Sequence, residues 1–264
     1  MNNLIGIAIL PVIFLLNYIY KKDVNREPSK LLKKTFILGM ITIAPSIFLE
    51  VLLEDIFPTD NYNSLISLFI CVFISIALIE EFFKWLIVKK IAYNNDEFDE
   101  TFDGIVYSIY SSLGFACLEN IGLVILSDFK TGIFRAITAV PAHACDAVIM
   151  GYFFGKAKQF KYNHDSKKEK KYLFLSIFIP TLVHAIYDFL LFTKRYIFIL
   201  IWILFIIIEF IICFNLVNKS SKNNDIFIKK DIQNSNNNFC VNCGTSIDNN
   251  DNFCKKCGTQ IKRL

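Results

Sequence analysis

Long apolar stretches are the feature that most limits what this chain can fold into. Of its 264 residues 54% are hydrophobic, and the mean hydropathy is +0.45. A helix needs about 20 apolar residues to cross a bilayer, and backbone groups in lipid must be satisfied within helices or closed barrels. Such continuous stretches predict an all-α, polytopic transmembrane helix bundle of about seven spans. They cover residues 4–20, 35–54, 63–88, 104–126, 133–155, 172–192 and 196–217.

The connections between these stretches differ in their content of Lys and Arg. The connection at 21–34 holds six and that at 156–171 holds seven, whereas those at 55–62, 127–135 and 193–195 hold none, two and two. Cytoplasmic connections carry the excess of positive charge. We expect a multi-pass protein of the cell membrane with its N-terminus outside and its C-terminal tail in the cytoplasm. The first stretch has no small-residue cleavage site, so we expect an anchor rather than a removable signal peptide.

Among the ionisable residues inside apolar stretches, five stand out: Glu80, Glu81, Glu119, His143 and His184. A charge at the bilayer centre costs roughly 3 kcal/mol or more, so such residues usually serve chemistry or transport. Alternate helices run in opposite directions, which places all five in the middle half of the bilayer. We expect them to converge on one site.

The acidic pair is followed by a lysine. Glu80 and Lys84 are four residues apart and share a helix face, whereas Glu81 points about 100° away from Glu80. We expect one carboxylate to pair with Lys84 and the other to face elsewhere, which would separate an acid from a base role. The alternative is a salt bridge near the cytoplasmic end of the span.

Polar neighbours can assist the histidines and glutamates. The amide of Asn120 can donate to an oxyanion. Asp146, three residues after His143, can orient that imidazole, and Asp188 stands four residues after His184. The alternatives are hydrogen bonds that only hold the helices together.

Two hydrolytic chemistries fit these residues. In one, a Glu deprotonates a water while His and Asn support the oxyanion. In the other, Glu and His side chains hold a catalytic divalent metal. The sequence spacing does not decide between them. Gly151 and Gly155, at small-xxx-small spacing, predict close helix packing beside His143.

Four sequence blocks together resemble the PrsW intramembrane proteases, which are related to the CAAX prenyl endopeptidases. The blocks are Glu80-Glu81-Phe82-Phe83-Lys84, residues 102–121 with Asp103-Gly104 and Glu119-Asn120, His143 with Gly151 and Gly155, and His184-Ala185-Ile186-Tyr187-Asp188-Phe189. The resemblance implies proteolysis within the membrane, with Glu80, Glu81, Glu119, His143 and His184 as catalytic residues.

The resemblance also implies a membrane-protein substrate, such as a single-span anti-sigma factor in envelope stress signalling. It leaves the glutamic and metal mechanisms open. Two departures from the family pattern concern the substrate groove. Ser108 stands where the family has Gly, and Ala144-Cys145-Asp146 is unusually polar.

The C-terminal region carries two near-copies of one cysteine knuckle. The pattern C-x2-C-x10-C-x2-C predicts a structural zinc ribbon over 239–261; its ligands are Cys240, Cys243, Cys254 and Cys257. Two disulfides are the alternative, which a reducing cytoplasm disfavours. We expect domains at 1–218 (membrane protease) and 239–261 (ribbon), with a flexible linker at 219–238. For the ribbon we expect a cytoplasmic protein partner rather than nucleic acid.

Two non-proteolytic functions remain as alternatives. One is a non-catalytic scaffold or immunity-type membrane protein, which would tolerate loss of the glutamates. The other is an ion-coupled transporter, since carboxylates near the bilayer midplane also suit that task. The chain shows no paired halves with Gly- or Pro-broken helices, which argues against the transporter.

Overall fold

The computed structural model describes residues 2–59, 62–126, 129–224, 245–247 and 253–260. The chain divides into two compact units, Met1–Ile226 and Phe227–Leu264. In the described part of the first unit all regular structure is helical, which confirms the predicted fold class.

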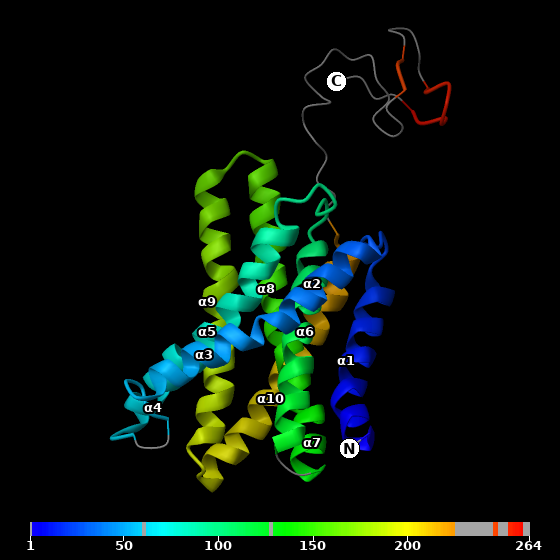
Figure 1. Ribbon diagram of the computed structural model, residues 1–264. Helices are drawn as coiled ribbons and strands as arrows, with labels where there is room; N and C mark the ends of the chain where they lie inside the picture. Colours follow the sequence, from blue (N-terminus) through cyan, green and yellow to red (C-terminus); the bar gives the residue numbers. More distant parts are fainter. Residues whose placement is uncertain (1, 60–61, 127–128, 225–244, 248–252, 261–264) are drawn as a thin grey trace. The chain divides into compact units, whose positions relative to one another are not determined.

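The first unit is a bundle in which α6, α8, α9 and α10 run roughly side by side, and the rod formed by α2 and α3 crosses them (Figure 1). Its helices are α1 (Asn2–Lys22), α2 (Ser29–Ile41), α3 (Ile43–Glu54), α4 (Leu65–Val72), η1 (Phe73–Ala77), α5 (Leu78–Ile87), η2 (Val88–Ala92), α6 (Asp103–Leu126), α7 (Phe129–Ile137), α8 (Ala139–Tyr162), α9 (Ser166–Phe192) and α10 (Tyr196–Lys222). The η segments are single π-helical turns on either side of α5.

Within the described residues, six segments are long and apolar enough to cross a membrane. They are Ser29–Glu54, Leu65–Ala92, Asp103–Leu126, Lys130–Tyr162, Ser166–Phe192 and Tyr196–Lys222. The first predicted stretch forms α1, which is helical as expected but is not one of these six. The helix α10 continues to Lys222, so the predicted linker cannot begin at residue 219; residues 225–238 lie outside the described part of the chain.

Of the prolines Pro45, Pro141 and Pro180, the first two follow breaks between helices. Thr42 separates α2 from α3 three residues before Pro45, and Thr138 separates α7 from α8 three residues before Pro141. Proline has no N–H to bond the carbonyl four residues earlier and clashes with it. The third, Pro180, lies inside the continuous helix α9.

Glycines set the distance between α6 and α8. A methyl group built on Gly151 would lie 2.4 Å from the carbonyl oxygen of Gly104, and one on Gly155 would lie 2.1 Å from that of Thr101. The backbones therefore touch where side chains would normally separate them. The close packing predicted from Gly151 and Gly155 is confirmed.

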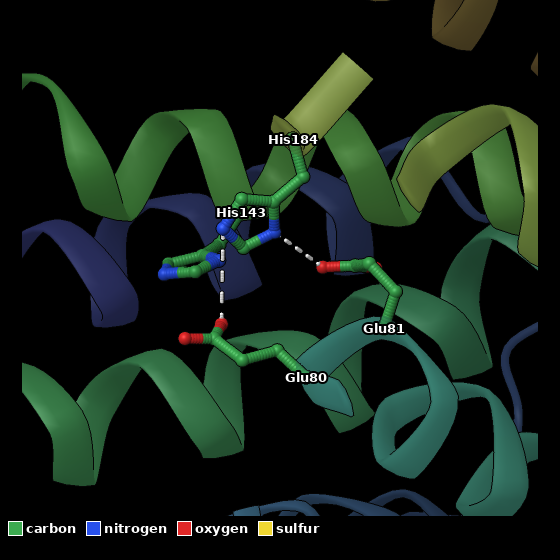
Figure 2. Close-up of side chains that lie close together, drawn as sticks. All are labelled: Glu80, Glu81, His143 and His184. Carbon is green, nitrogen blue, oxygen red and sulfur yellow. Dashed lines mark hydrogen bonds and ion pairs between the residues drawn. The ribbon is translucent and has the colours of Figure 1, made fainter. Parts of the chain in front are cut away.

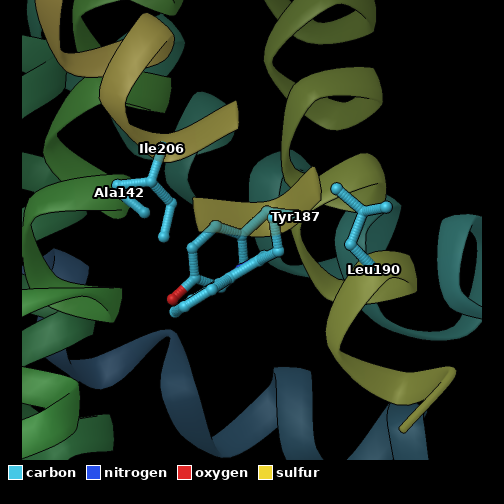
Figure 3. Packing of buried hydrophobic residues seen from close by; sticks show 5 residues of the cluster. Ala142, Tyr187, Leu190 and Ile206 are labelled. Carbon is cyan, nitrogen blue, oxygen red and sulfur yellow. The ribbon is translucent and has the colours of Figure 1, made fainter. Parts of the chain in front are cut away.

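An apolar cluster fixes α8, α9 and α10 together next to the charged residues (Figure 3). It is formed by Ala142, Tyr187, Leu190, Trp202 and Ile206. Ala142 precedes His143, and Tyr187 lies between His184 and Asp188 in the sequence. This packing holds the backbone on which those side chains stand.

The Lys- and Arg-rich connections share one end of the bundle. Lys22 donates to Asn218 at 2.7 Å, and Tyr93 donates to Glu169 at 2.9 Å. At the same end the loop carboxylate of Glu27 is buried and accepts a hydrogen bond from Tyr107. Burial raises the pKa of Glu27 to about 7, although the Tyr107 hydroxyl acts in the opposite direction.

The second unit is described at residues 245–247 and 253–260. Phe253 and Gln260 form an antiparallel bridge around a tight turn, in which the amide of Gly258 donates to the carbonyl of Cys254 at 2.9 Å. Gly258 has a φ of 73°, a left-handed conformation that glycine adopts readily. This is the knuckle turn that the sequence predicts; Cys240, Cys243 and Gly244 lie outside the described residues.

Candidate active site

Two glutamates and two histidines from three helices meet inside the bundle. Glu80 and Glu81 come from α5, His143 from α8 and His184 from α9, and one ligand atom of each lies within 4.8 Å of all the others (Figure 2). All four residues are buried. The predicted convergence of buried acids and imidazoles is therefore confirmed for these four.

Lys84 lies among these four residues. Its ammonium donates to Glu80 at 3.0 Å and to Glu81 at 2.8 Å, contacts Nδ1 of His143 at 3.1 Å, and lies 4.4 Å from the ring centre of Phe115. The expectation that only one carboxylate pairs with Lys84 is wrong. Residues three and four positions apart both reach the same helix face, so one long side chain serves both acids.

His184 has a carboxylate at each ring nitrogen. Its Nδ1 lies 2.9 Å from Glu81, and its Nε2 lies 3.4 Å from Asp188. Asp146, expected beside His143, instead lies 3.6 Å from Nδ1 of His184. Asp146 is on α8, one helical turn from His143. Its carboxylate contacts His184 on the neighbouring helix α9 rather than His143 on α8.

His143 is held on both sides as well. Its Nε2 lies 3.0 Å from one oxygen of Glu119 on α6, and the other oxygen of Glu119 accepts a hydrogen bond from Nη2 of Arg135 at 2.7 Å. Glu119 thus contacts the site through His143, but it is not one of the four mutually close donors.

Asn120 does not reach this site. Its amide nitrogen donates to the backbone carbonyl of Ala8 on α1 at 3.3 Å, and the residue is fully buried. Successive helical residues point about 100° apart, so Asn120 faces α1 while Glu119 faces His143. The predicted oxyanion role of Asn120 is therefore wrong, and the alternative of a helix-linking hydrogen bond is correct.

A cavity of about 200 Å³ adjoins the donor set. It is lined by Glu50, Ile76, Glu80, Glu119, Arg135, Ala139, Ala142, His143, Asp146, His184, Tyr187, Asp188 and Phe192. Glu80 faces this cavity, whereas Glu81 is behind it and fully buried.

Sequence reasoning missed two charged residues of this cavity. Glu50 lies within an apolar stretch, the same signal that singled out Glu80. Arg135 was counted as a charge of a connection, because it stands at the end of a short helix before the break at Thr138.

The four donors fit a divalent metal ion. Carboxylate oxygen and imidazole nitrogen are ligands that zinc accepts. One carboxylate oxygen of Glu81, Oε2, is buried and has no hydrogen-bond partner in the part of the chain that the structure describes, and a buried polar atom of this kind needs a partner. Lys84 supplies the positive charge beside the donors in the structure described here.

The fold and the site define a class: multi-pass helical membrane proteins that carry a buried Glu/His site able to activate water. The family model described as PrsW family intramembrane metalloprotease matches residues 27–214. The chain therefore belongs to this family and is a peptide hydrolase, which removes the scaffold and transporter alternatives. A zinc-ribbon domain model matches residues 239–261, in agreement with the predicted metal-binding tail.

Curated relatives agree along most of the chain. Protease PrsW of Oceanobacillus iheyensis is 41% identical over 191 residues, which are 72% of this chain and 84% of the relative. The Geobacillus kaustophilus protein of the same name is 40% identical, covering 74% and 82%, and that of Bacillus subtilis is 38% identical, covering 71% and 82%. No solved structure matches the chain.

Proposed function

We propose that the Glu80–Glu81–His143–His184 set hydrolyses a peptide bond of a membrane protein within the bilayer. The observation that carries this proposal is the convergence of four buried donors from α5, α8 and α9 beside a cavity. Burial in lipid makes such a cluster costly, and its placement at a cavity gives it access to a substrate.

A divalent ion such as zinc would be held by these four residues, where it acts as a Lewis acid and lowers the pKa of a bound water. The other functions belong to the chain itself. Glu80 lines the cavity and is the carboxylate best placed to accept the proton of a water. Glu81 is buried behind it and holds the imidazole of His184 and the ammonium of Lys84.

The supporting residues restrict the histidine rings. Asp188 lies at Nε2 of His184, opposite the Glu81 contact at Nδ1, and Glu119 lies at Nε2 of His143, opposite the Lys84 contact at Nδ1. A carboxylate in this position fixes both the orientation of a ring and the nitrogen that carries the proton. The ammonium of Lys84 reduces the repulsion between the two adjacent carboxylates until a proton or an ion binds there.

We infer that the substrate is a single-span membrane protein. An anti-sigma factor, as the resemblance implies, is the specific candidate, and its cleavage would carry envelope stress to transcription. We also propose that the C-terminal tail is cytoplasmic. The gathering of the Lys- and Arg-rich connections at one end of the bundle supports this orientation.

The test compares membrane peptides from cells that carry the wild-type protein or the Glu80→Gln variant. Substrate fragments should disappear in Glu80→Gln and in Glu81→Gln, while both variants still insert. Glu97→Gln, a change at an exposed acid of the bundle, serves as the matched control. Normal fragments in both active-site variants would contradict the proposal.

A further inference from the structure

Arg135, which is not part of the donor set, is linked to His143 of that set through Glu119. Arg135, on the short helix α7, donates from Nη2 to Glu119 at 2.7 Å, and both side chains are about four-fifths buried, with exposed fractions of 22% and 18%. Nε of Arg135 is buried without a hydrogen-bond partner among the described residues. The ion pair with Glu119 therefore offsets the desolvation cost of burying this guanidinium.

Glu119 divides its two oxygens between two partners. One accepts from Arg135, and the other lies 3.0 Å from Nε2 of His143. A carboxylate held at one oxygen by a guanidinium has a fixed plane and a fixed negative charge. The direction in which Glu119 presents its second oxygen therefore depends on Arg135.

The partner of the opposite nitrogen of His143 also contributes to the choice of tautomer. Nδ1 lies 3.1 Å from the ammonium of Lys84, which has hydrogens to donate and no lone pair. While this contact holds, Nδ1 accepts from Lys84 and Nε2 donates the ring proton to Glu119, so the tautomer depends on both partners of His143. This tautomer leaves the lone pair of Nδ1 on the side of Lys84, whose ammonium also contacts Glu80 and Glu81.

We propose that Arg135 is a positioning residue of the hydrolytic site, which acts through Glu119 to hold His143 as the Nε2–H tautomer. The proposal rests on the hydrolytic function argued above, but its geometry spans α7, α6 and α8 and can be tested without a substrate. Loss of the guanidinium would leave the Glu119 carboxylate uncompensated. Glu119 would then be free to leave His143, for example toward water in the cavity that it lines.

The chain offers a residue-resolved readout because it contains three histidines, His143, His164 and His184. Solid-state NMR of the full chain, labelled at histidine with ¹⁵N and ¹³C in lipid bilayers, separates the two tautomers of each ring. The signals are assigned with His164→Asn and His143→Asn. The wild type should show His143 protonated at Nε2, whether Nδ1 faces the ammonium or a metal.

The test substitution is Arg135→Gln, with Lys130→Gln as the matched control, since Lys130 is an exposed cation of the same helix. Arg135→Gln should convert the His143 signals to mixed tautomers and leave those of His184 unchanged. Arg135→Lys keeps a positive charge and should restore most of the wild-type pattern. An unchanged His143 signature in Arg135→Gln overturns the proposal. If Arg135→Gln does not accumulate, Glu119→Gln is measured instead and should change the same His143 signals. Unchanged His143 signals in Glu119→Gln would also overturn the proposal.

Cleavage of a single-span reporter identified in the peptide comparison gives a second readout. Arg135→Gln should lower kcat by about 10- to 100-fold, as is typical when an outer partner of a site histidine is lost, with little change in KM. The double variant Arg135→Gln/Glu119→Gln should be no slower than Glu119→Gln alone, whereas the effect should multiply with Asp188→Asn. Multiplication with Glu119→Gln would overturn the proposal. If His143 responds as expected but Glu80→Gln still cleaves, the hydrolytic function fails and the positioning role stands.

Discussion

Lys84 is a buried cation whose partners are the residues proposed to do the chemistry. Its exposed fraction is 0%, and it contacts two carboxylates and an imidazole. An ammonium can remain charged at such depth only if its surroundings compensate it. Lys84 and the acidic pair are therefore a single electrostatic unit, and removing one member should affect the others.

We predict that Lys84→Met destabilises the chelator-treated protein by about 3–5 kcal/mol, the usual cost of leaving a buried charge without its partner. Thermal unfolding in detergent micelles measures this loss. Lys90→Met, at an exposed lysine of η2, the turn that follows α5, is the control. Zinc should recover more stability in Lys84→Met than in the wild type, because the ion would replace the missing positive charge. Equal unfolding temperatures for the two lysine variants would refute the prediction.

Helical periodicity predicted part of the site and missed part. The spacing of four residues correctly paired Glu80 with Lys84, but the 100° rotation wrongly sent Glu81 elsewhere, because the flexible lysine side chain spans both positions. Which helix faces Asp146 and Asn120 depends on the tertiary arrangement. That arrangement is not encoded in spacing along one helix.

At the scale of elements, the contact between α6 and α8 controls the site most directly. The backbone of Gly151 lies against that of Gly104, two helical turns from His143 along α8. Any side chain here must move one helix relative to the other. The four donors tolerate little displacement, since each partner distance is near 3 Å.

We predict that Gly151→Ala lowers both stability and cleavage. The added methyl would lie 2.4 Å from backbone atoms of Gly104 and Ile105, and overpacking of this kind costs about 1–3 kcal/mol. Gly122→Ala in α6 is the matched control, because a methyl group there meets no atom of the described residues within 4 Å. Thermal unfolding and reporter cleavage are measured for both; an effect no larger at Gly151 than at Gly122 would count against close packing as the cause.

The elements themselves were largely predictable from the length of the apolar stretches. Their ends were not, because helices continue past the apolar stretches into polar turns, as α8 does to Tyr162 and α10 to Lys222. In those turns the helix is favoured by the preceding turns and by contacts such as Lys158 with the carbonyl of Tyr93 at 2.7 Å. Composition alone does not report such contacts.

At the scale of the whole molecule, the bundle should respond to pH through its loop end. Burial raises the pKa of Glu27 from 4.5 to about 7, so the folded state favours the protonated carboxyl. The resulting stability is fully present below pH 4.5 and is lost as the pH rises through about 7. We predict that the unfolding temperature falls between pH 5 and pH 8, and that Glu27→Gln flattens this slope.

Thermal unfolding in micelles across this pH range checks the prediction, with Glu97→Gln as the control. Glu97 is exposed, so its loss should leave the slope as in the wild type. A Glu27→Gln variant with an undiminished slope would mean that another group carries the pH dependence.

The two units should respond separately to metal removal. The donor set lies in the unit Met1–Ile226, and the ribbon cysteines lie in the other unit. We predict that a chelator stops reporter cleavage by the full chain, and that Cys254→Ser, which breaks the ribbon, still cleaves and is still chelator-sensitive. Cleavage by Cys254→Ser that resists the chelator would assign the metal requirement to the ribbon.

The ammonium of Lys84 also bears on the order in which this enzyme is inserted into the membrane and loaded with zinc. Because the Lys84 ammonium already offsets part of the negative charge of Glu80 and Glu81, we expect the membrane unit to be synthesised and inserted before zinc is delivered. A ribbon of 23 residues has too small a core for such independence and folds with its ion. In a zinc-starved cell we therefore expect the protein to accumulate in an inserted but inactive form, with a C-terminal ribbon that lacks its zinc ion.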